Sequence, residues 1–269
     1  MTESSAAARV IRMEAINNFR DYGDLPTTAG GRLRPGRLFR SAHHARATPA
    51  DVARLAGLGL AMVTDLRHPD ERAEQPNAWR GTLAIHVIET PVDAAAAGPR
   101  REAPHLAALR TSDGSAEAMT GFLAAHYRHL PYDPAYVSLY SRYFAALAER
   151  DGAMLIHCAA GKDRTGILAW LTHHLLGVHP DDAMADYLLS NTASGIAERL
   201  PHLRRRLEES SGQPIGDDAI MALLGVSPRF MANCLGAIDE RSGSMTAYLE
   251  QVLGIDAARR EAIRGRLVI

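Results

Sequence analysis

The sequence predicts an α/β domain built around a central, mostly parallel sheet. Short apolar runs alternate with helical segments in the first part of the chain, and residues 181–269 have a helical pattern. The chain of 269 residues is long enough to bury a full core, and 46% of its residues are apolar and 23% charged. These values exclude collagen-like, coiled-coil and wholly disordered chains, and we treat residues 1–269 as one domain.

The N-terminal residues predict a hairpin followed by a helix. Turn signals at 21–23 and 29–31 precede the apolar pair at 38–39, an arrangement typical of a short hairpin. The next helix begins with Thr48 as its N-cap and ends at Gly59.

Three apolar runs predict the strands of the sheet. Residues 60–63 lead directly into the polar sequence TDLR, and residues 83–88 and 153–156 form the other two runs. Since functional groups gather at the carboxyl ends of parallel strands, the polar residues after these runs are candidates for a site.

The remaining segments predict helices and one insertion. Residues 93–118 are Ala-rich and interrupted by Gly and Pro, and we interpret them as a mobile insertion. Helices are expected at 135–150 and at 167–176, the second closed by Gly177.

Charge and cysteine content narrow the class of protein. The formal net charge of −1 argues against nucleic acid as the main partner. Cys158 and Cys234 are too few for a disulfide framework, which indicates a reducing compartment. The N-terminus has no apolar signal-peptide core and we find no apolar run of membrane-spanning length, so we expect a cytoplasmic protein without stable membrane insertion. Export without a leader and the oligomeric state stay open.

One lysine stands out among the basic residues. Of the 30 basic side chains only Lys162 is a lysine, and it lies in the segment HCAAGKDRTG. Lysine carries a compact point charge on a thin stem, whereas arginine is a broad fork. A crowded anion site at this segment explains why arginine does not replace it.

The same segment places Cys158 and Arg164 in a Cys-x5-Arg arrangement between an apolar strand and a helix. A loop entering a helix N-terminus turns backbone N–H groups inward and forms a nest for an anion. The small residues Ala159, Ala160 and Gly161 leave this nest open, and glycine permits positive φ. Such a setting also lowers the pKa of a cysteine and favours its thiolate.

This arrangement predicts hydrolysis of a phosphate ester. Cys158 attacks phosphorus to form a cysteinyl-phosphate, which water then hydrolyses. The planar fork of Arg164 holds two phosphoryl oxygens, and Thr165 is placed to donate a hydrogen bond to the sulfur. Backbone N–H groups and arginine supply the positive charge, so no metal and no cofactor are expected.

Histidines offer a different chemistry that we consider weaker. His157 precedes Cys158, but adjacent strand residues point to opposite faces, so we expect it to support the loop instead of acting as a base. The pair His126 and His129 lacks a converging third ligand, and we predict no metal site.

Beyond its chemistry, HCAAGKDRTG resembles the signature loop of the cysteine-dependent tyrosine phosphatases. Its GKDRTG ending is similar to a bacterial atypical subgroup with mycobacterial and Listeria members. The segments NNFRDYGDLPT, RPGRLFRSA and VTDLRHPDE agree with this resemblance, which spans residues 16–178. It implies a phosphatase fold with a central, mostly parallel sheet flanked by helices. It also implies activity on phosphotyrosine, on phosphoserine and phosphothreonine, and on phosphoinositides.

The resemblance also implies roles for single residues. Cys158 is the nucleophile, Arg164 is the phosphate clamp, and Lys162 is an additional cation like that of lipid phosphatases. Residues 159–161 and Thr165 complete the substrate-binding loop. Asn18, Arg20, Asp21, Arg40 and Ser41 match the N-terminal family segments, and we expect them to be buried beneath the loop.

The general acid is left between two aspartates. No Trp-Pro-Asp tripeptide occurs in the chain, and Asp133 matches no family motif. The resemblance points to Asp163 within the loop and to Asp65 at the end of a strand. We place Asp163 first because it is closest by sequence, and Asp65 has the alternatives of pairing with Arg67 or orienting the clamp.

Three other functions remain as alternatives. A dedicated phosphoinositide or inositol-phosphate phosphatase is favoured by Lys162. An inactive module would use the nest to hold phosphorylated proteins or lipids, although a nucleophile, a clamp and an acid are all present. A rhodanese-like sulfur carrier disagrees with the arginine at the sixth position after the cysteine.

Overall fold

The computed structural model describes residues 8–91, 109 and 114–269. Its centre is a five-stranded sheet with the order β1-β2-β5-β3-β4. Within the sheet β2, β5, β3 and β4 are parallel, and β1 pairs with β2 in the antiparallel direction. The predicted α/β architecture with a mostly parallel sheet is therefore confirmed. The strands are β1 (Arg20–Asp21), β2 (Leu38–Ser41), β3 (Leu60–Asp65), β4 (His86–Glu89) and β5 (Ala153–His157).

β5 occupies the middle of the sheet because all five of its residues are buried. Successive strand residues face opposite sides, and the packing follows this alternation. Leu155 and Val63 join one hydrophobic core, whereas Ile156 and Met62 join the core on the other face. The sheet thus separates two cores and carries the residue after β5, Cys158, to its carboxyl edge.

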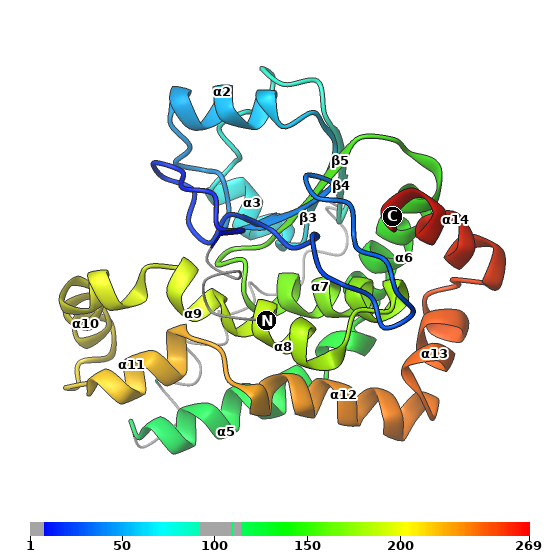
Figure 1. Ribbon diagram of the computed structural model, residues 1–269. Helices are drawn as coiled ribbons and strands as arrows, with labels where there is room; N and C mark the ends of the chain where they lie inside the picture. Colours follow the sequence, from blue (N-terminus) through cyan, green and yellow to red (C-terminus); the bar gives the residue numbers. More distant parts are fainter. Residues whose placement is uncertain (1–7, 92–108, 110–113) are drawn as a thin grey trace.

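Helices cover both faces of the sheet (Figure 1). On one face α2 buries Leu55 in the smaller core. On the other face α6 and α7 fill the larger core, and α7 ends at Gly177 with φ of 79°, as predicted. The helices of this inner layer are α2 (Pro49–Gly57), α3 (Pro69–Glu74), α6 (Pro134–Glu149), α7 (Asp163–Leu176) and α8 (Pro180–Leu188).

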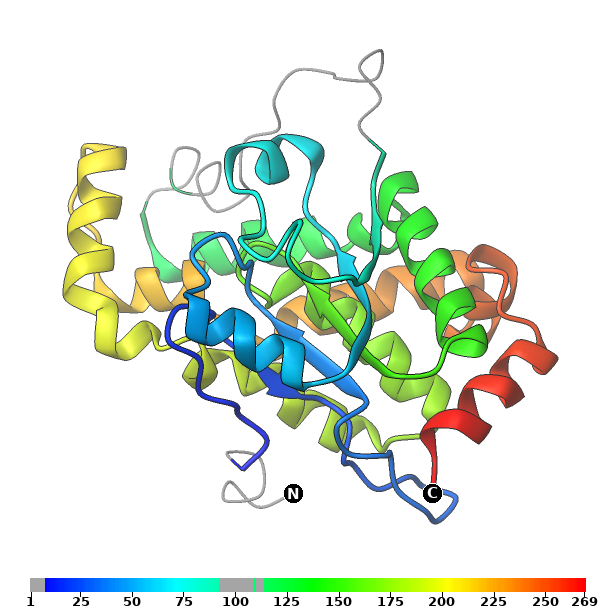
Figure 2. The same ribbon diagram turned by 90° about the horizontal axis from the view of Figure 1, so that it is seen from above.

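An outer layer of helices packs beyond α6 and α7 (Figure 1). The helix α5 (Ala116–Tyr127) lies against α11 (Asp217–Leu224) and α12 (Pro228–Ser242). Together with α10 (Ile196–Ser211), α5 and α11 bury a small separate core. Both views place α10 at the edge of the molecule (Figures 1 and 2).

The C-terminal portion is helical, as the sequence predicts. α14 packs against α6 and α7, and Ile269 exchanges backbone hydrogen bonds with Arg32. This pairing brings the C-terminus beside the loop that joins β1 and β2 (Figure 2). The short elements are η1 (Leu130–Tyr132), α9 (Ser190–Ala193), α13 (Met245–Ala247), η2 (Tyr248–Val252) and α14 (Ala257–Leu267).

Several predicted segments agree with the structure and some boundaries differ. Thr48 caps α2 as expected, and the predicted hairpin is present as the antiparallel pair β1 and β2. The strand predicted at 83–88 begins three residues later, as β4. Most of the segment 93–118, the predicted insertion, lies outside the described residues, although its end at Ala116 already belongs to α5.

One described stretch, Asp217–Ser242, is apolar enough by composition to cross a membrane, with a mean hydropathy of 1.3. The structure divides this stretch into α11 and α12, separated at Gly225. Its apolar residues Ile220 and Phe230 are fully buried, so the two helices contribute to the cores of the fold.

Candidate active site

The loop of residues 158–162 connects the carboxyl end of β5 to the first turn of α7. Because β2 and β3 flank β5 in parallel, the residues that follow all three strands meet at this edge. The sequence prediction that Cys158 opens a strand-to-helix loop is therefore confirmed. Cys158 itself is only 2% exposed.

The loop has its carbonyl groups turned outward and hydrogen-bonded. The backbone N–H of His43 donates to the Ala159 oxygen at 3.1 Å. The amide of Asn18 donates to the Ala160 oxygen at 3.1 Å and to the Gly161 oxygen at 3.0 Å. A trans peptide places N–H opposite C=O, so the N–H groups of residues 160–162 face the inner side of the loop. This is the anion nest that the sequence predicts.

Gly161 is required by the shape of the loop. Its φ is 69°, a left-handed conformation. A Cβ atom at this position would lie 2.2 Å from the backbone oxygen of Ser41 in β2. Any larger residue would therefore push the loop away from the sheet.

A buried charge cluster supports the loop from below. The carboxylate of Asp186 in α8 accepts hydrogen bonds from Arg9 at 2.9 Å, Arg20 at 3.2 Å and Arg40 at 2.8 Å. Arg40 also donates to the Gly161 oxygen at 3.0 Å. Burial and the neighbouring Arg40 lower the pKa of Arg20 to about 9, so this guanidinium still stays charged at neutral pH. The excess of positive charge behind the loop favours an anion within it.

Arg164 lies in the first turn of α7 and is held in one orientation. Its Nη1 donates to the Leu66 oxygen at 3.1 Å and to Glu71 Oε2 at 2.5 Å, and its Nη2 donates to Glu71 Oε1 at 2.9 Å. A guanidinium has five N–H donors, so two, on Nε and Nη2, remain after these contacts with the described residues. These two lie on one edge of the guanidinium and match two oxygens of a phosphoryl group.

Asp163 directly follows the loop in the chain and lines the cavity described below. It is the first residue of α7, and its side chain is 31% exposed. Tyr127 of α5 donates a hydrogen bond of 2.7 Å to Oδ1. The Lys162 ammonium lies 3.9 Å from Oδ2.

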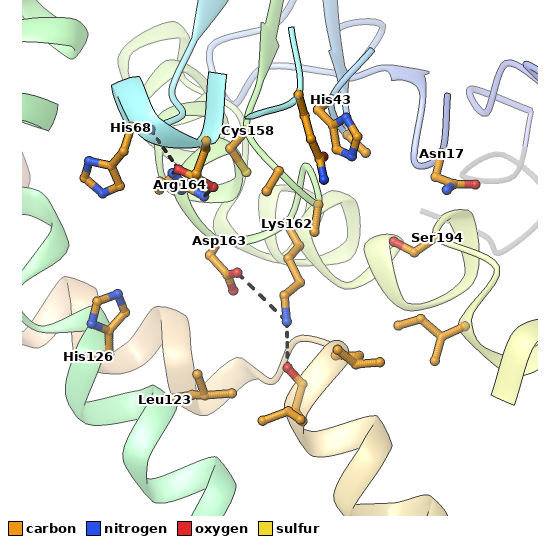
Figure 3. Close-up of a pocket in the computed structure, with 18 of the residues that line it drawn as sticks. Asn17, His43, His68, Leu123, His126, Cys158, Lys162, Asp163, Arg164 and Ser194 are labelled. Atoms are coloured by element: carbon orange, nitrogen blue, oxygen red, sulfur yellow. Dashed lines mark hydrogen bonds and ion pairs between the residues drawn. The ribbon is translucent and has the colours of Figure 1, made fainter. Parts of the chain in front are cut away.

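These side chains line one cavity of about 510 Å³ (Figure 3). Cys158, Lys162, Asp163 and Arg164 come from the loop and the start of α7. Figure 3 shows the Asp163 carboxylate and the Lys162 ammonium reaching away from the loop. Further lining residues from α3, α5, α10 and α11 include His68, Leu123, His126, Arg199, Leu203 and Leu223.

A family model described as the tyrosine phosphatase family matches residues 11–269. The chain belongs to the tyrosine phosphatase family. It is therefore a phosphatase, and the resemblance found in the sequence is confirmed.

Named relatives extend over nearly the whole chain. The triple specificity protein phosphatase PtpB of Mycobacterium tuberculosis is 32% identical over 93% of this chain and 96% of its own length. A protein of Cupriavidus necator whose name assigns it to the tyrosine-protein phosphatases is 32% identical over 96% of this chain and 90% of its own length. A tyrosine-protein phosphatase of Nostoc commune is 28% identical over 86% of this chain and 74% of its own length.

The position of Asp65 in this tyrosine phosphatase does not fit a general acid. Its carboxylate is fully buried and accepts three hydrogen bonds from Arg67, two from the guanidinium at 2.9 and 2.7 Å and one from the backbone N–H at 3.1 Å. Asn77 donates a fourth at 3.1 Å. Burial alone would raise the pKa of Asp65, but His157 and Arg67 outweigh this and hold it well below the usual value. The carboxylate therefore stays ionised, and the pairing with Arg67, the alternative in the sequence analysis, is the one observed.

His157 supports the end of β5 and does not face the cavity, as expected. Its Nε2 lies 3.5 Å from Asp65 and its ring stacks on His44 with centroids 4.7 Å apart. Burial lowers the pKa of His157 to about 4 despite the nearby Asp65. The side chain is neutral at physiological pH.

Lys162 lines the cavity beside the loop. Its ammonium donates to the backbone oxygens of Leu223 at 3.0 Å and Gly225 at 2.9 Å, at the end of α11. The last carbonyls of a helix lack intrahelical partners and attract a cation. The role of a phosphate-loop cation stays a prediction.

Two further predictions concern hydroxyl and carboxylate groups. Thr165 is buried, and its Oγ1 has no hydrogen-bond partner among the described residues, so the expected bond to the cysteine sulfur is not formed. Asp133 lines the cavity, and its Oδ1 caps α6 through the N–H of Ala135 at 2.9 Å.

The predicted support from the N-terminal family segments is largely confirmed. Asn18, Arg20, Arg40 and Ser41 are all buried, and Asn18 and Arg40 contact the loop directly. Asp21 instead binds the backbone N–H groups of nearby turn residues.

The sequence analysis missed Glu71 and Tyr127. Glu71 follows the capping pattern of His68 at the start of α3, a signal that predicts a helix start but not its contact with Arg164. Tyr127 carries no sequence signal, because its partner lies 36 residues away on another helix.

Proposed function

We propose that this phosphatase is a metal-independent phosphomonoester hydrolase that works through a cysteinyl-phosphate. The observation that carries the proposal is that Cys158, Arg164 and Asp163 line the same cavity. The inward N–H groups of the loop and the oriented guanidinium of Arg164 provide the donors that a phosphoryl group needs. These groups provide the charge stabilisation of the transition state.

In the first step the Cys158 thiolate attacks phosphorus while Arg164 and the loop N–H groups hold the phosphoryl oxygens. An S–P bond forms as the bond from phosphorus to the leaving oxygen breaks. Asp163 gives its proton to that oxygen, so the alcohol or phenol leaves neutral. Asp163 suits this role because it lies in the cavity, whereas Asp65 is buried and ion-paired.

In the second step a water molecule attacks the phosphorus of the cysteinyl-phosphate. Asp163, now ionised, accepts the proton of that water, and the S–P bond breaks to release inorganic phosphate and the thiolate. A reducing compartment preserves such a thiolate, which supports the cytoplasm as the place of action.

The proposed substrates are phosphotyrosine first, with phosphoserine, phosphothreonine and phosphoinositides as further substrates. The size of the cavity, about 510 Å³, supports a broad range, as does the printed name of the mycobacterial relative. The narrower alternative, a dedicated phosphoinositide phosphatase, depended on Lys162. It loses that support because the ammonium is bound to α11.

The test is phosphate release from matched phosphotyrosine, phosphoserine, phosphothreonine and phosphoinositide substrates, in EDTA with a reductant. Activity is expected to survive EDTA and to vanish in Cys158→Ser. The matched control is Cys234→Ser, since Cys234 is also buried but lies in α12, and burial raises its pKa far above the usual value. This control is expected to retain turnover wherever a thermal melt shows that it is folded.

Two results would oppose the proposal. Turnover that persists in Cys158→Ser would exclude the cysteine mechanism. No turnover on any substrate, with inorganic phosphate still binding, would favour the inactive binding module instead.

A further inference from the structure

Two buried tyrosines connect Asp163 to the interior of the fold. The hydroxyl of Tyr127 in α5 donates to Asp163 Oδ1 at 2.7 Å, and the hydroxyl of Tyr187 in α8 donates to Tyr127 Oη at 2.9 Å. Each tyrosine is 1% exposed. Three separate helices, α5, α7 and α8, thus meet at this one carboxylate.

The direction of the two hydrogen bonds follows from the chemistry of the groups. An ionised carboxylate only accepts hydrogen bonds. Tyr127 therefore donates its hydroxyl hydrogen to Asp163 and accepts a hydrogen bond from Tyr187. Burial raises the pKa of both phenols well above the usual value, so both keep their protons. The bond from Tyr127 to Oδ1 also persists when Asp163 carries a proton on Oδ2.

Gly166, the last residue of the segment HCAAGKDRTG, leaves space for the Tyr187 ring. A Cβ atom at position 166 would lie 2.8 Å from Cε2 and 2.9 Å from Cδ2 of the Tyr187 ring. The glycine has no positive φ, so its missing side chain matters for space alone. The Tyr187 ring therefore packs against α7 one turn after Asp163.

We propose that Tyr127 and Tyr187 are positioning residues for the general acid. They hold Oδ1 of Asp163 and leave Oδ2, 3.9 Å from the Lys162 ammonium, to carry the proton toward the leaving oxygen. Without this hold, the carboxylate, whose side chain is 31% exposed, turns freely about its side-chain bonds and meets the leaving oxygen less often. The inference rests on the proposed function, in which Asp163 is the acid.

The tyrosines position the carboxylate and do not conduct protons. Proton conduction needs an exit to water. Among the described residues, the series of hydrogen bonds from Asp163 through Tyr127 ends at Tyr187, which is buried beside Gly166. The effect of removing a hydroxyl should therefore fall on substrates that need the acid, and not on all substrates alike.

Aryl phosphates distinguish a loss of acid catalysis from a general loss of activity, because their leaving groups differ in basicity. Dinitrophenyl phosphate releases a stable phenolate and needs little help from an acid, whereas phenyl phosphate needs a proton at the leaving oxygen. For Asp163→Asn we expect kcat/KM on phenyl phosphate to fall by roughly a hundredfold or more, with a much smaller loss on dinitrophenyl phosphate.

Tyr127→Phe is expected to show the same selectivity in weaker form. Its kcat/KM should fall about tenfold on phenyl phosphate and stay within about twofold of wild type on dinitrophenyl phosphate. Tyr187→Phe keeps the direct bond to Asp163, so a smaller loss in the same direction is expected. It also keeps the proposal testable where Tyr127→Phe fails to fold.

Tyr143→Phe is the matched control. Tyr143 and Tyr22 form a similar buried pair of hydroxyls, 2.6 Å apart, that does not include Asp163. Its removal costs a buried tyrosine hydrogen bond without touching the acid, so kcat/KM should change equally little on both substrates.

The possible failures are distinguishable. Inactivity of the wild type on every substrate refutes the proposed function, and the inference with it. Equal losses on both substrates in Asp163→Asn refute Asp163 as the acid. A selective loss in Asp163→Asn, with wild-type selectivity in both tyrosine variants, refutes the positioning role alone.

Discussion

At the scale of single residues, Glu71 orients Arg164, the proposed phosphate clamp. Its two oxygens accept from Nη1 and Nη2, which leaves one edge of the guanidinium for substrate. Arg164 lowers the pKa of Glu71 to about 2 against the opposing effect of burial, so the carboxylate is ionised at any working pH. The pair acts as a preformed clamp.

We predict that Glu71→Gln weakens inhibition by inorganic phosphate by about tenfold, because the neutral amide keeps one acceptor oxygen and its NH2 group cannot accept from Arg164. The measurement is the inhibition constant for phosphate at constant pH. Glu74→Gln, on the same helix, is the control and should leave the constant unchanged. An unchanged inhibition constant in Glu71→Gln would show that Arg164 keeps its orientation without Glu71.

His157 predicts how stability depends on pH. Its pKa is about 4 in the folded chain and about 6.5 when unfolded, so the unfolded state binds more protons between these values. Its contribution to stability is therefore complete above pH 6.5 and is lost as the pH falls toward 4, by about 3 kcal/mol in total.

Denaturant unfolding at several pH values checks this prediction. The side chain of His157→Asn does not titrate. Between pH 6.5 and 4, the free energy of unfolding of this variant should therefore depend less steeply on pH, by the amount that corresponds to about one bound proton. An equal slope in both proteins would mean that other groups, such as the buried His44, cause the acid sensitivity.

The reactive residues were the most predictable part of the site. Cys158, Arg164 and Gly161 share one short loop, so spacing and backbone chemistry suffice to place them together. Glu71 and Tyr127 were not predictable, since each meets the loop only through the packing of another element. Asp65 was left between two roles, because its position at the end of β3 does not show whether Arg67 folds back onto it.

At the scale of elements, helices with strong apolar periodicity and clear caps were predicted correctly. α2 has a capping box at Thr48, and α7 is apolar along its length and closed by Gly177. The helix α3 was missed because it has only six residues, too few to show a period. β1 has two residues, and its pairing with β2 depends on the sheet.

Lys162 links the loop to the end of α11, and this link predicts a change at the level of helices. Lys162→Met leaves the Leu223 and Gly225 oxygens without their donor. We expect amide hydrogen exchange in α10 and α11 to rise about tenfold, with exchange in α6 unchanged.

The control for this prediction is Arg204→Gln. Arg204 pairs with Asp217 on the surface of the same two helices, and exposed pairs contribute little to stability. Exchange in this variant should stay close to wild type. Equal rates in Lys162→Met and wild type would mean that α11 is held by its apolar contacts alone.

At the scale of the whole molecule, Asp186 joins segments that are far apart in sequence. It holds Arg9 before the sheet, Arg20 in β1 and Arg40 in β2, and through Arg40 it reaches the loop. Sequence patterns did not predict this cluster, because the segments that form it meet only in the folded chain.

We predict that Asp186→Asn is strongly destabilising, by about 3–5 kcal/mol, since it leaves three buried cations without a counter-charge. Chemical denaturation measures the loss. Asp24→Asn is the control, because the Asp24–Arg32 pair is exposed and should contribute no more than about 1 kcal/mol. A small loss in Asp186→Asn would indicate that the arginines are compensated elsewhere.

The covalent intermediate is the central claim, and trapping it is the most direct test. The enzyme is mixed with an aryl phosphate, quenched with acid during turnover and digested, and the peptides are analysed by mass spectrometry. We predict one phosphoryl group on the peptide that contains Cys158, and none in Cys158→Ser. Turnover without a phosphorylated Cys158 peptide, or a phosphoryl group on another residue, would contradict the account.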